Sequence, residues 1–208
     1  MSPRELLERG TAMLGMPASA SACDRLLDYV ELLAKWNQTY NLTAIRDPRD
    51  MVSHHLLDSL AVRPHLPEGA LADVGSGPGL PGIPLAIVEP ERRVTLNDAS
   101  QKKTAFLRQA IIELRLSNAV VHEGRVQSWQ PAPRFACVIS RGFSELARFI
   151  AACRHLVASG GVLAAMKGTF PRQEVDGLHG DADCGDIRRL TVPFLDAERH
   201  LVLCRCAE

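Results

Sequence analysis

Residues 73–82 constrain the fold more than any other part of the chain. They read Asp-Val-Gly-Ser-Gly-Pro-Gly-Leu-Pro-Gly, follow a short apolar run at 70–72 and precede a helix-compatible run at 83–88. A strand that ends in a glycine-rich turn and leads into a helix is typical of α/β proteins that bring backbone close to a nucleotide-like ligand. The segment therefore predicts an α/β fold with a ligand-binding turn, the alternative being a purely structural turn.

The two common phosphate-binding loops do not fit this turn. It lacks the Gly-Lys-Ser/Thr ending of a P-loop, and Leu80 stands where G-x-G-x-x-G needs its third glycine. Gly75, Gly77 and Gly79 recur instead at a spacing of two, and Asp73 comes just before them. An aspartate suits a ligand with a cationic amino-acid end better than it suits a pyrophosphate. S-adenosylmethionine is such a ligand, and we expect it as cofactor.

A second acidic residue supports a nucleotide-like ligand. The run 93–97 is a strand candidate that leads into Asp98. An acid at the end of the second strand accepts hydrogen bonds from ribose hydroxyls in nucleotide-binding α/β units. Alternatively, Asp98 or Ser100 starts the helix expected at 101–115, and the two roles are compatible.

The order of the expected elements predicts a Rossmann-like fold with a mostly parallel sheet. Residues 3–62 are helical in pattern, and the boundary with the main domain is marked at 65–69, which divides the chain into an N-terminal helical extension (1–66) and a cofactor-binding domain (67–208). Beyond that boundary, strand and helix candidates alternate, as in a sheet covered on both faces. The final two strands have no helix between them, which predicts an antiparallel C-terminal hairpin. The strand candidates are 70–74, 93–97, 119–122, 135–140, 161–166, 187–192 and 199–205, and the helix candidates between them are 81–88, 101–115 and 144–157.

Composition excludes several classes of protein. Lys plus Arg and Asp plus Glu are both 24 of 208 residues, so a nucleic acid would have to be met by a local patch. No apolar run approaches the ~20 residues of a membrane span, and no export signal begins the chain, so we expect a cytoplasmic protein without membrane contact. The six cysteines form no C-x-x-C pair and no zinc-like spacing, which predicts reduced thiols and no metal site.

Two arginines are candidates for the chemistry. Arg141 follows the fourth strand candidate, where cofactor and substrate meet in an open parallel sheet. Its alternative role is to cap a helix or pair with a carboxylate. Arg125 follows the third strand and either faces the substrate or is a solvated surface residue. The backbone of the next two residues, Val126 and Gln127, is expected beside the adenine.

Missing motifs narrow the reaction class. No Asn/Asp-Pro-Pro-Tyr/Phe is present for methylation of an exocyclic amine, and Cys137 lies inside a strand, where it is unsuited to act as a pyrimidine C5 nucleophile. If a base is the substrate, a ring nitrogen fits better. Guanine N7 already carries an accessible lone pair, so catalysis would rest on alignment and stabilisation of charge.

The N-terminal segment offers further candidates for the site. Trp36 and Tyr40 are four residues apart, which favours packing of a helix against the domain over stacking on RNA bases. His55, Asp58 and Ser59 share roughly one helix face and are expected to line the cleft. Residues that form either a basic rim or ordinary surface charge are Lys167, Arg188, Arg189, Arg199 and His200.

Five motifs resemble, in order, those of the bacterial small-subunit ribosomal RNA guanine-N7 methyltransferases, also called glucose-inhibited division protein B. They are Lys-Trp-Asn-x-x-Tyr-Asn-Leu-Thr at 35–43, His-Leu-Leu-Asp-Ser-Leu at 55–60, the glycine segment extended to 84, Ser-Arg-Gly-Phe at 140–143 and Glu-Arg-His-Leu at 198–201. The resemblance runs from about residue 23 to residue 205. Several separate motifs in one order make it specific.

The resemblance implies a class I methyltransferase that uses S-adenosylmethionine to methylate N7 of a guanine in 16S ribosomal RNA. The small ribosomal subunit is then the partner, and a monomer is expected. The family's cofactor contacts fall on Gly75, Leu80, Val126, Gln127 and Arg141, with Asp98 on the ribose side. Gln127 stands where glutamate is common, and Gly142 where alanine is common.

Two other functions remain open on the same domain. A small-molecule methyltransferase is one, because the fold does not fix the substrate. A ribosome-assembly factor with a vestigial cofactor site is the other. The intact glycine segment and Asp98 argue against the second of these.

Overall fold

A computed structural model of the chain describes residues 1–143, 145–178 and 182–206. Seven strands form one sheet in the order β3-β2-β1-β4-β5-β7-β6. The first five strands are mutually parallel, and β7 runs antiparallel to both β5 and β6. The predicted mostly parallel sheet with an antiparallel C-terminal hairpin is confirmed. The strands are β1 (Leu71–Val74), β2 (Val94–Asp98), β3 (Ala119–Glu123), β4 (Phe135–Ser140), β5 (Val157–Lys167), β6 (Ala182–Arg189) and β7 (His200–Cys206).

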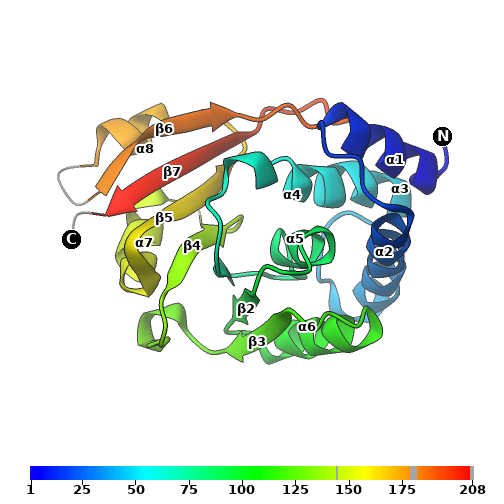
Figure 1. Cartoon of the computed structure of the whole chain (residues 1–208), viewed down its shortest axis with the longest axis horizontal. Helices are drawn as coiled ribbons and strands as arrows, with labels where there is room; N and C mark the ends of the chain where they lie inside the picture. The colour runs from blue at the N-terminus through cyan, green and yellow to red at the C-terminus, as the bar shows by residue number, and fades with distance from the viewer. Residues whose placement is uncertain (144, 179–181, 207–208) are drawn as a thin grey trace.

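Helices cover both faces of the sheet (Figure 1). The helices α5 (Gly82–Val88) and α6 (Gln101–Glu113) lie on one face, and α7 (Leu146–Cys153) and α8 (Arg172–Asp176) on the other. The N-terminal helices α1 (Pro3–Met13) and α2 (Ala20–Tyr40) pack on the α5–α6 side. They are followed by α3 (Pro48–Met51), a π-helical turn at Val52–Leu57 and α4 (Asp58–Leu60).

The strand order reverses between β1 and β4. From β1 the chain moves outward through β2 to β3, and then returns to β4 on the other side of β1. Leu71 pairs with Val94 on one side and with Cys137 on the other. Ligands of open α/β sheets bind beyond the carboxyl ends of the strands at such a switch point. The glycine turn after β1 and the turn after β4 therefore lie side by side at this position.

Local sequence explains where the helices start. Ser2 caps α1 and forms a capping box with Glu5, and Ser19 accepts a hydrogen bond from the backbone of Ala22 at the start of α2. Asp47 caps α3, whose first residue is Pro48, as the Asp-Pro pair predicts. The π-helical turn that follows has no signal in the sequence. Such turns are frequent at functional sites.

Several predicted boundaries are wrong. The strand expected at 161–166 is β5, which already begins at Val157. The helix expected at 144–157 spans Leu146–Cys153, because Arg154–Leu156 forms a 3₁₀ turn and β5 already begins at Val157. Ser144, where that helix was expected to start, lies outside the described residues. The strand expected at 187–192 is β6, which ends at Arg189 and extends back to Ala182. As an edge strand, β6 exposes most of its side chains, so its first half carries little apolar signal.

The prediction of reduced thiols is also wrong in one place. Cys184 on β6 and Cys204 on β7 form a disulfide between neighbouring antiparallel strands. Their separation of 20 residues matches no short cysteine motif, so only the strand pairing brings them together. Cys137 is a free, buried residue, as expected.

Buried side chains form a core on each face of the sheet. One extends from the N-terminal helices through α5 and α6 to the sheet, and the other joins the opposite sheet face to α7. Across the described parts of the chain, no helix combines the length and apolarity that crossing a membrane requires. In the same parts, no three His, Cys, Asp or Glu side chains are grouped so that they could hold a metal ion.

Candidate active site

The glycine turn exposes its backbone at one point and packs tightly at another. Gly75 has φ +67°, and a Cβ placed there would meet no atom within 4 Å. Gly79 has φ +94°, and a Cβ there would lie 2.4 Å from the Ile83 side chain. Gly75 thus leaves room for a ligand against the main chain. Gly79 instead lets the turn pack against α5.

Tyr29 of α2 holds this turn from outside the main domain. Its side chain is fully buried, and its hydroxyl donates a 2.8 Å hydrogen bond to the carbonyl of Pro78. Burial raises the pKa of the Tyr29 phenol, so it stays protonated and remains a donor. An N-terminal helix therefore helps to fix the shape of the turn.

Asp73 lies beneath the turn rather than on its surface. Its Oδ2 accepts a 2.9 Å hydrogen bond from the backbone of Gly82, while the buried Oδ1 has no partner among the described residues. Burial raises the pKa of Asp73 to about 7, against the opposing effect of the Gly82 hydrogen bond. Asp73 ties the strand end to the start of α5, and an unpartnered acceptor remains directly below the glycine turn.

A cavity of about 380 Å³ opens at the ends of β1, β2 and β3. Asp98 lies at this cavity, where its Oδ2 accepts from the backbone of Gly77 at 3.0 Å and its Oδ1 from that of Ser100 at 2.9 Å. Ser100 is the N-cap residue of α6, though its side chain makes no capping hydrogen bond, and Asp98 holds the backbone of Ser100 just before the helix while also reaching the ligand cavity. The other lining residues are Val74, Gly75, Asn97, Ala99, Lys103, Gly124, Arg125, Val126, Gln127, Gly142 and Phe143.

The residues at this cavity fit S-adenosylmethionine. Gly75 gives open access to the main chain, Asp98 supplies a carboxylate at the end of β2, and the backbone of Val126 and Gln127 follows β3 at the same cavity. The volume is within the ~300–1,000 Å³ typical of ligand pockets. A cationic amino acid and a ribose find complementary groups here.

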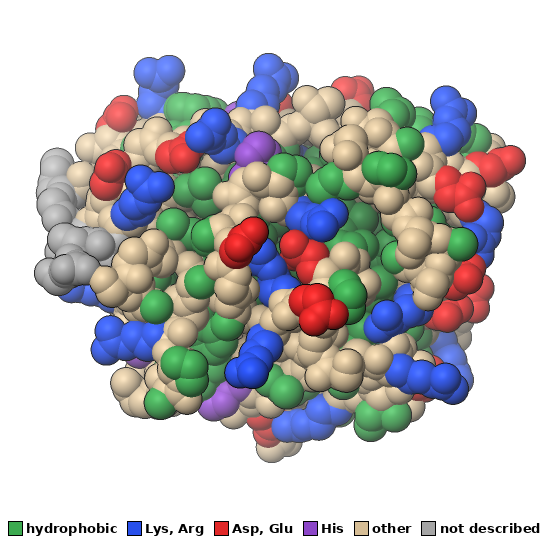
Figure 2. All heavy atoms as spheres, viewed as in Figure 1, with side chains coloured by type: hydrophobic (Ala, Val, Ile, Leu, Met, Phe, Trp, Pro, Cys, Tyr) green, Lys and Arg blue, Asp and Glu red, His purple; other side chains and the backbone are tan. Residues whose placement is uncertain are grey.

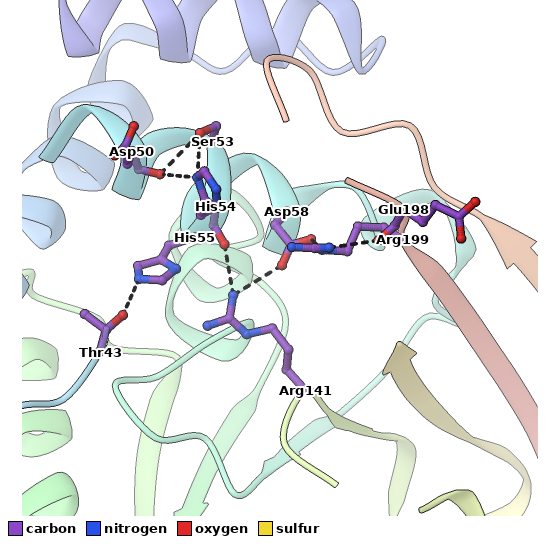
Figure 3. Close-up of polar contacts among 9 residues, drawn as sticks. All are labelled: Thr43, Asp50, Ser53, His54, His55, Asp58, Arg141, Glu198 and Arg199. Carbon is purple, nitrogen blue, oxygen red and sulfur yellow. Dashed lines mark hydrogen bonds and ion pairs between the residues drawn. The ribbon is translucent and has the colours of Figure 1, made fainter. Parts of the chain in front are cut away.

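A second cavity of about 430 Å³ lies beside the first. The turn after β4 separates them, because the side chain of Arg141 lines the second cavity whereas Gly142 and Phe143 line the first. In the second cavity, Arg141 Nη1 and Arg199 Nε lie 3.2 Å and 2.8 Å from the two carboxylate oxygens of Asp58 (Figure 3). The alternative role suggested for Arg141, pairing with a carboxylate, is thus confirmed. Its side chain lines the second cavity and not the first, and its role toward cofactor and substrate stays a prediction.

His55 forms another wall of the second cavity. It lies on the π-helical turn, is 4% exposed, and shares a 2.8 Å hydrogen bond between its Nε2 and the Thr43 hydroxyl (Figure 3). Burial, together with the nearby Arg141 cation, lowers the pKa of His55 to about 4. The imidazole is therefore neutral near pH 7. It orders the loop containing Thr43 and adds no charge to the cavity.

The structure brings together only part of the predicted site. Gly75, Asp98, Arg125, Val126 and Gln127 line the first cavity. His55 and Asp58 line the second cavity with Arg141, as their shared helix face suggested, and Lys167 and Arg199 join them. The candidate residues that line neither cavity are Asp73, Gly77, Gly79, Leu80, Ser59, Arg188, Arg189 and His200.

One of the two departures from the usual motifs, Gly142, and the aromatic pair are readily explained. A Cβ at position 142 would lie 3.7 Å from the carbonyl of Gly75, an ordinary contact, so this site accepts glycine or alanine. Trp36 packs on Phe106 of α6 with ring centres 5.5 Å apart. This is the packing role favoured for Trp36. Tyr40 lies next to it, and 41% of its surface is exposed.

Several residues that shape the site were missed from the sequence. Asn97 donates from its side chain to the carbonyls of His122 and Gly124 and so joins the ends of β2 and β3. Glu174 of α8 pairs with Lys167 at 2.8 Å across the rim of the second cavity. Neither residue belongs to a recognisable motif. Asn97 alone had a local signal, its place just before Asp98.

Comparison with known proteins adds an independent finding. The sequence profile of a family described as rRNA small subunit methyltransferase G matches residues 22–202. Ribosomal RNA small subunit methyltransferase G of Methylobacillus flagellatus is 51% identical over 199 residues, 96% of each chain. The protein of the same name from Neisseria meningitidis serogroup B is 51% identical over 205 residues, 98% of each chain.

Solved structures with low sequence identity share the fold. TrmN from Thermus thermophilus has a TM-score of 0.56 at 14% identity, and the match covers 75% of this chain and 53% of that chain. The DhpI–SAH complex has a TM-score of 0.51 at 18% identity, with 91% of this chain and 99% of that chain covered. These similarities confirm the predicted Rossmann-like class I methyltransferase fold.

Proposed function

The chain belongs to the rRNA small subunit methyltransferase G family, and we propose that it transfers the methyl group of S-adenosylmethionine to N7 of one guanine in 16S ribosomal RNA. The family predicted from the five motifs is thereby confirmed. The enzyme class and the methyl donor follow from the family. The target atom and the individual roles of the residues are part of the proposal.

The observation that carries the proposal is the pair of adjoining cavities at the switch point. One is built from Gly75, Asp98 and the segment 124–127, and its groups suit an amino acid and a nucleoside. The other contains Arg141 and Arg199, and cationic groups suit a nucleic acid. A methyl group moving between two ligands requires such neighbouring sites.

Each residue of the first cavity has a proposed role. Asp98 accepts hydrogen bonds from the ribose, and the backbone at Val126 and Gln127 contacts the adenine. Gly75 offers its main chain to the amino-acid end, together with Gly77, Gly79 and Leu80 of the same turn. Asp73 acts from below by holding that turn in shape. Arg125 lines this cavity and extends toward the RNA.

The proposed reaction requires alignment of the reacting atoms and no proton transfer to the protein. Bound S-adenosylmethionine supplies an electrophilic methyl group on a sulfonium centre. Guanine N7 carries its own lone pair, so no side chain has to remove a proton. The neutral His55 lies beside the base, and the cationic Arg141 helps to hold the RNA so that N7 is aligned with the methyl group. Of the described residues, no cysteine lines either cavity, which agrees with a direct transfer.

The test is transfer of radiolabelled methyl from S-adenosylmethionine to small ribosomal subunits that lack the modification. Naked 16S RNA and large subunits serve as alternative acceptors. Asp98→Asn is the site variant. Asp196→Asn, which makes the same change at an exposed residue, is the matched control. We expect label in small-subunit RNA that is released by mild depurination and is lost only in Asp98→Asn.

Other outcomes favour other functions. Binding of the cofactor without label in any RNA would favour a small-molecule methyltransferase. Failure to bind the cofactor would favour an assembly factor with a vestigial site.

We further propose that the protein acts as a monomer in the cytoplasm, where its substrate is found. Sedimentation at micromolar concentration tests whether the protein is a monomer.

A further inference from the structure

Two arginines far apart in the sequence share one buried carboxylate. Asp58 follows the π-helical turn, Arg141 follows β4, and Arg199 precedes β7. The side chain of Asp58 is 3% exposed, against 26% for Arg141 and 24% for Arg199. Figure 3 shows both guanidinium groups directed at this carboxylate from different segments. The carboxylate is thus internal, and the cations extend from it toward the cavity.

The charges of Asp58, Arg141 and Arg199, here called the Asp58 group, do not cancel. One carboxylate faces two guanidinium groups, and the neighbouring His55 is neutral because its pKa is lowered to about 4. Lys167 at the same cavity is paired with Glu174. The group therefore carries about one unit of positive charge. On the face of the molecule in Figure 2, by contrast, basic and acidic side chains are interspersed rather than gathered into one wide patch.

The hydrogen bonds of Asp58 set the direction of each arginine. Arg141 donates to Asp58 and to the His54 carbonyl through Nη1 alone. Arg199 donates to Asp58 through Nε and to the Glu198 carbonyl through Nη1. Among the described residues, the Nη2 group of each arginine has no such acceptor. Both cations line the cavity and retain N–H groups for a ligand.

We propose that Asp58 is a positioning residue that orients Arg141 and Arg199 to bind one backbone phosphate of the ribosomal RNA beside the target guanine. The inference rests on the proposed function. A phosphodiester carries one negative charge and matches the excess charge of the group, whereas a guanine ring is neutral. Guanidinium forks bind phosphate oxygens with defined geometry, and such contacts fix the register of a nucleic acid.

The variant Asp58→Asn separates positioning from simple charge. It removes a negative charge, so electrostatic attraction alone predicts tighter RNA binding and a steeper salt dependence. If the arginines lose their orientation, RNA binding should instead become weaker and its salt dependence less steep. We expect the KM for small subunits to rise about tenfold with kcat changed less than about threefold. We also expect the log–log salt slope of RNA binding to fall by ~0.7, the contribution of one single-strand phosphate.

The matched control is Asp186→Asn. Asp186 is exposed and pairs with Arg188 on β6, so the change makes the same chemical alteration outside both cavities. Asp186→Asn is expected to leave the KM for small subunits, kcat and the salt slope of RNA binding unchanged. Affinity for S-adenosylmethionine, measured calorimetrically on the protein alone, is expected to stay unchanged in both variants.

A second variant covers the case in which Asp58→Asn fails to fold. Arg199→Lys keeps the charge at a side chain that is one-quarter exposed, but it removes the fork. The same rise in KM is expected. Unchanged or tighter RNA binding in a folded variant would overturn the proposal, and so would a parallel loss of cofactor affinity. If wild-type protein labels no small-subunit RNA, the proposed function itself fails, which is a distinct result.

Discussion

A single hydroxyl group connects the N-terminal helices to the cofactor turn. Tyr29→Phe removes the donor to the Pro78 carbonyl and leaves that buried acceptor unpaired. We expect unfolding free energy to fall by about 1–3 kcal/mol. We also expect weaker binding of S-adenosylmethionine, because the turn loses a support. Urea unfolding and calorimetry measure the two effects. Tyr40→Phe, at an exposed ring, is the control, and equal effects in both variants would remove Tyr29 from this role.

His55 makes stability depend on pH in a defined direction. Its pKa is about 4 in the folded protein against 6.5 for an ordinary histidine, so between these values the unfolded chain binds more protons. Its contribution to stability is therefore present above pH 6.5 and is lost as pH falls toward 4. Asp73 acts in the opposite sense, because its folded pKa of about 7 lies above its ordinary 3.8. Its contribution is present below pH 3.8 and is lost as pH rises through 7.

Comparison of wild type with His55→Gln isolates the histidine, because Asp73 is common to both proteins. The wild type should lose stability more steeply than the variant as pH falls from 6.5 to 4.5. The difference in slope approaches, at most, about 1.4 kcal/mol per pH unit for one proton. Urea unfolding at pH 4.5, 5.5, 6.5 and 7.5 measures it. Parallel curves would show that His55 titrates normally.

Residues of the first cavity were predictable because short motifs encode them. Gly75 directly follows β1, Asp98 ends β2 and Gln127 lies in the turn after β3, so their place at the sheet edge follows from the pattern of elements. The Asp58–Arg141–Arg199 group was not predictable. Its members are 83 and 141 residues from Asp58 and meet only through the tertiary fold. The sequence suggested separate cleft and rim residues but not their shared carboxylate.

At the scale of elements, burial decides which predictions succeed. The strands β1, β2 and β4 are almost wholly buried, so their apolar runs are clear in the sequence. The edge strand β6 is mostly exposed, and its start at Ala182 was missed together with the disulfide that it forms. The π-helical turn was also missed, because helical periodicity does not distinguish it from an α-helix.

The turn between β1 and α5 allows a test that separates strain from ligand contact. Gly75 and Gly15 have nearly equal φ values, +67° and +72°, and a Cβ at either would meet nothing within 4 Å. Alanine at each should cost a similar ~1–2 kcal/mol of backbone strain. Only Gly75→Ala places a methyl group at the cofactor cavity. We expect at least a tenfold loss of S-adenosylmethionine affinity there, which corresponds to about 1.4 kcal/mol.

Calorimetry on the two alanine variants, with unfolding curves for each, measures this difference. Equal cofactor affinity in Gly75→Ala and Gly15→Ala would show that the main chain at position 75 does not contact the ligand. A loss of affinity in both variants would point to a general effect of strain.

At the scale of the whole molecule, the N-terminal helices and the sheet share one core. A continuous cluster joins Leu7 of α1, Leu33 of α2, Phe106 of α6 and Leu201 of β7. The same helical region supplies Tyr29 to the cofactor turn and Asp58 to the second cavity. The division at residue 66 stays a prediction. Shared contacts of this kind favour one cooperative unit over two independent ones.

Unfolding of the intact chain should therefore occur in a single transition. In scanning calorimetry, we expect the calorimetric and van't Hoff enthalpies to agree. A truncated chain that begins at residue 67 would expose the side chains of α5 and α6 now covered by α2 and α4, such as Phe106, and is expected to unfold without cooperativity. Two transitions in the intact chain, or cooperative unfolding of the truncated one, would instead establish a methyltransferase domain that folds alone. In that case the N-terminal helices would serve the active site without being needed for the fold.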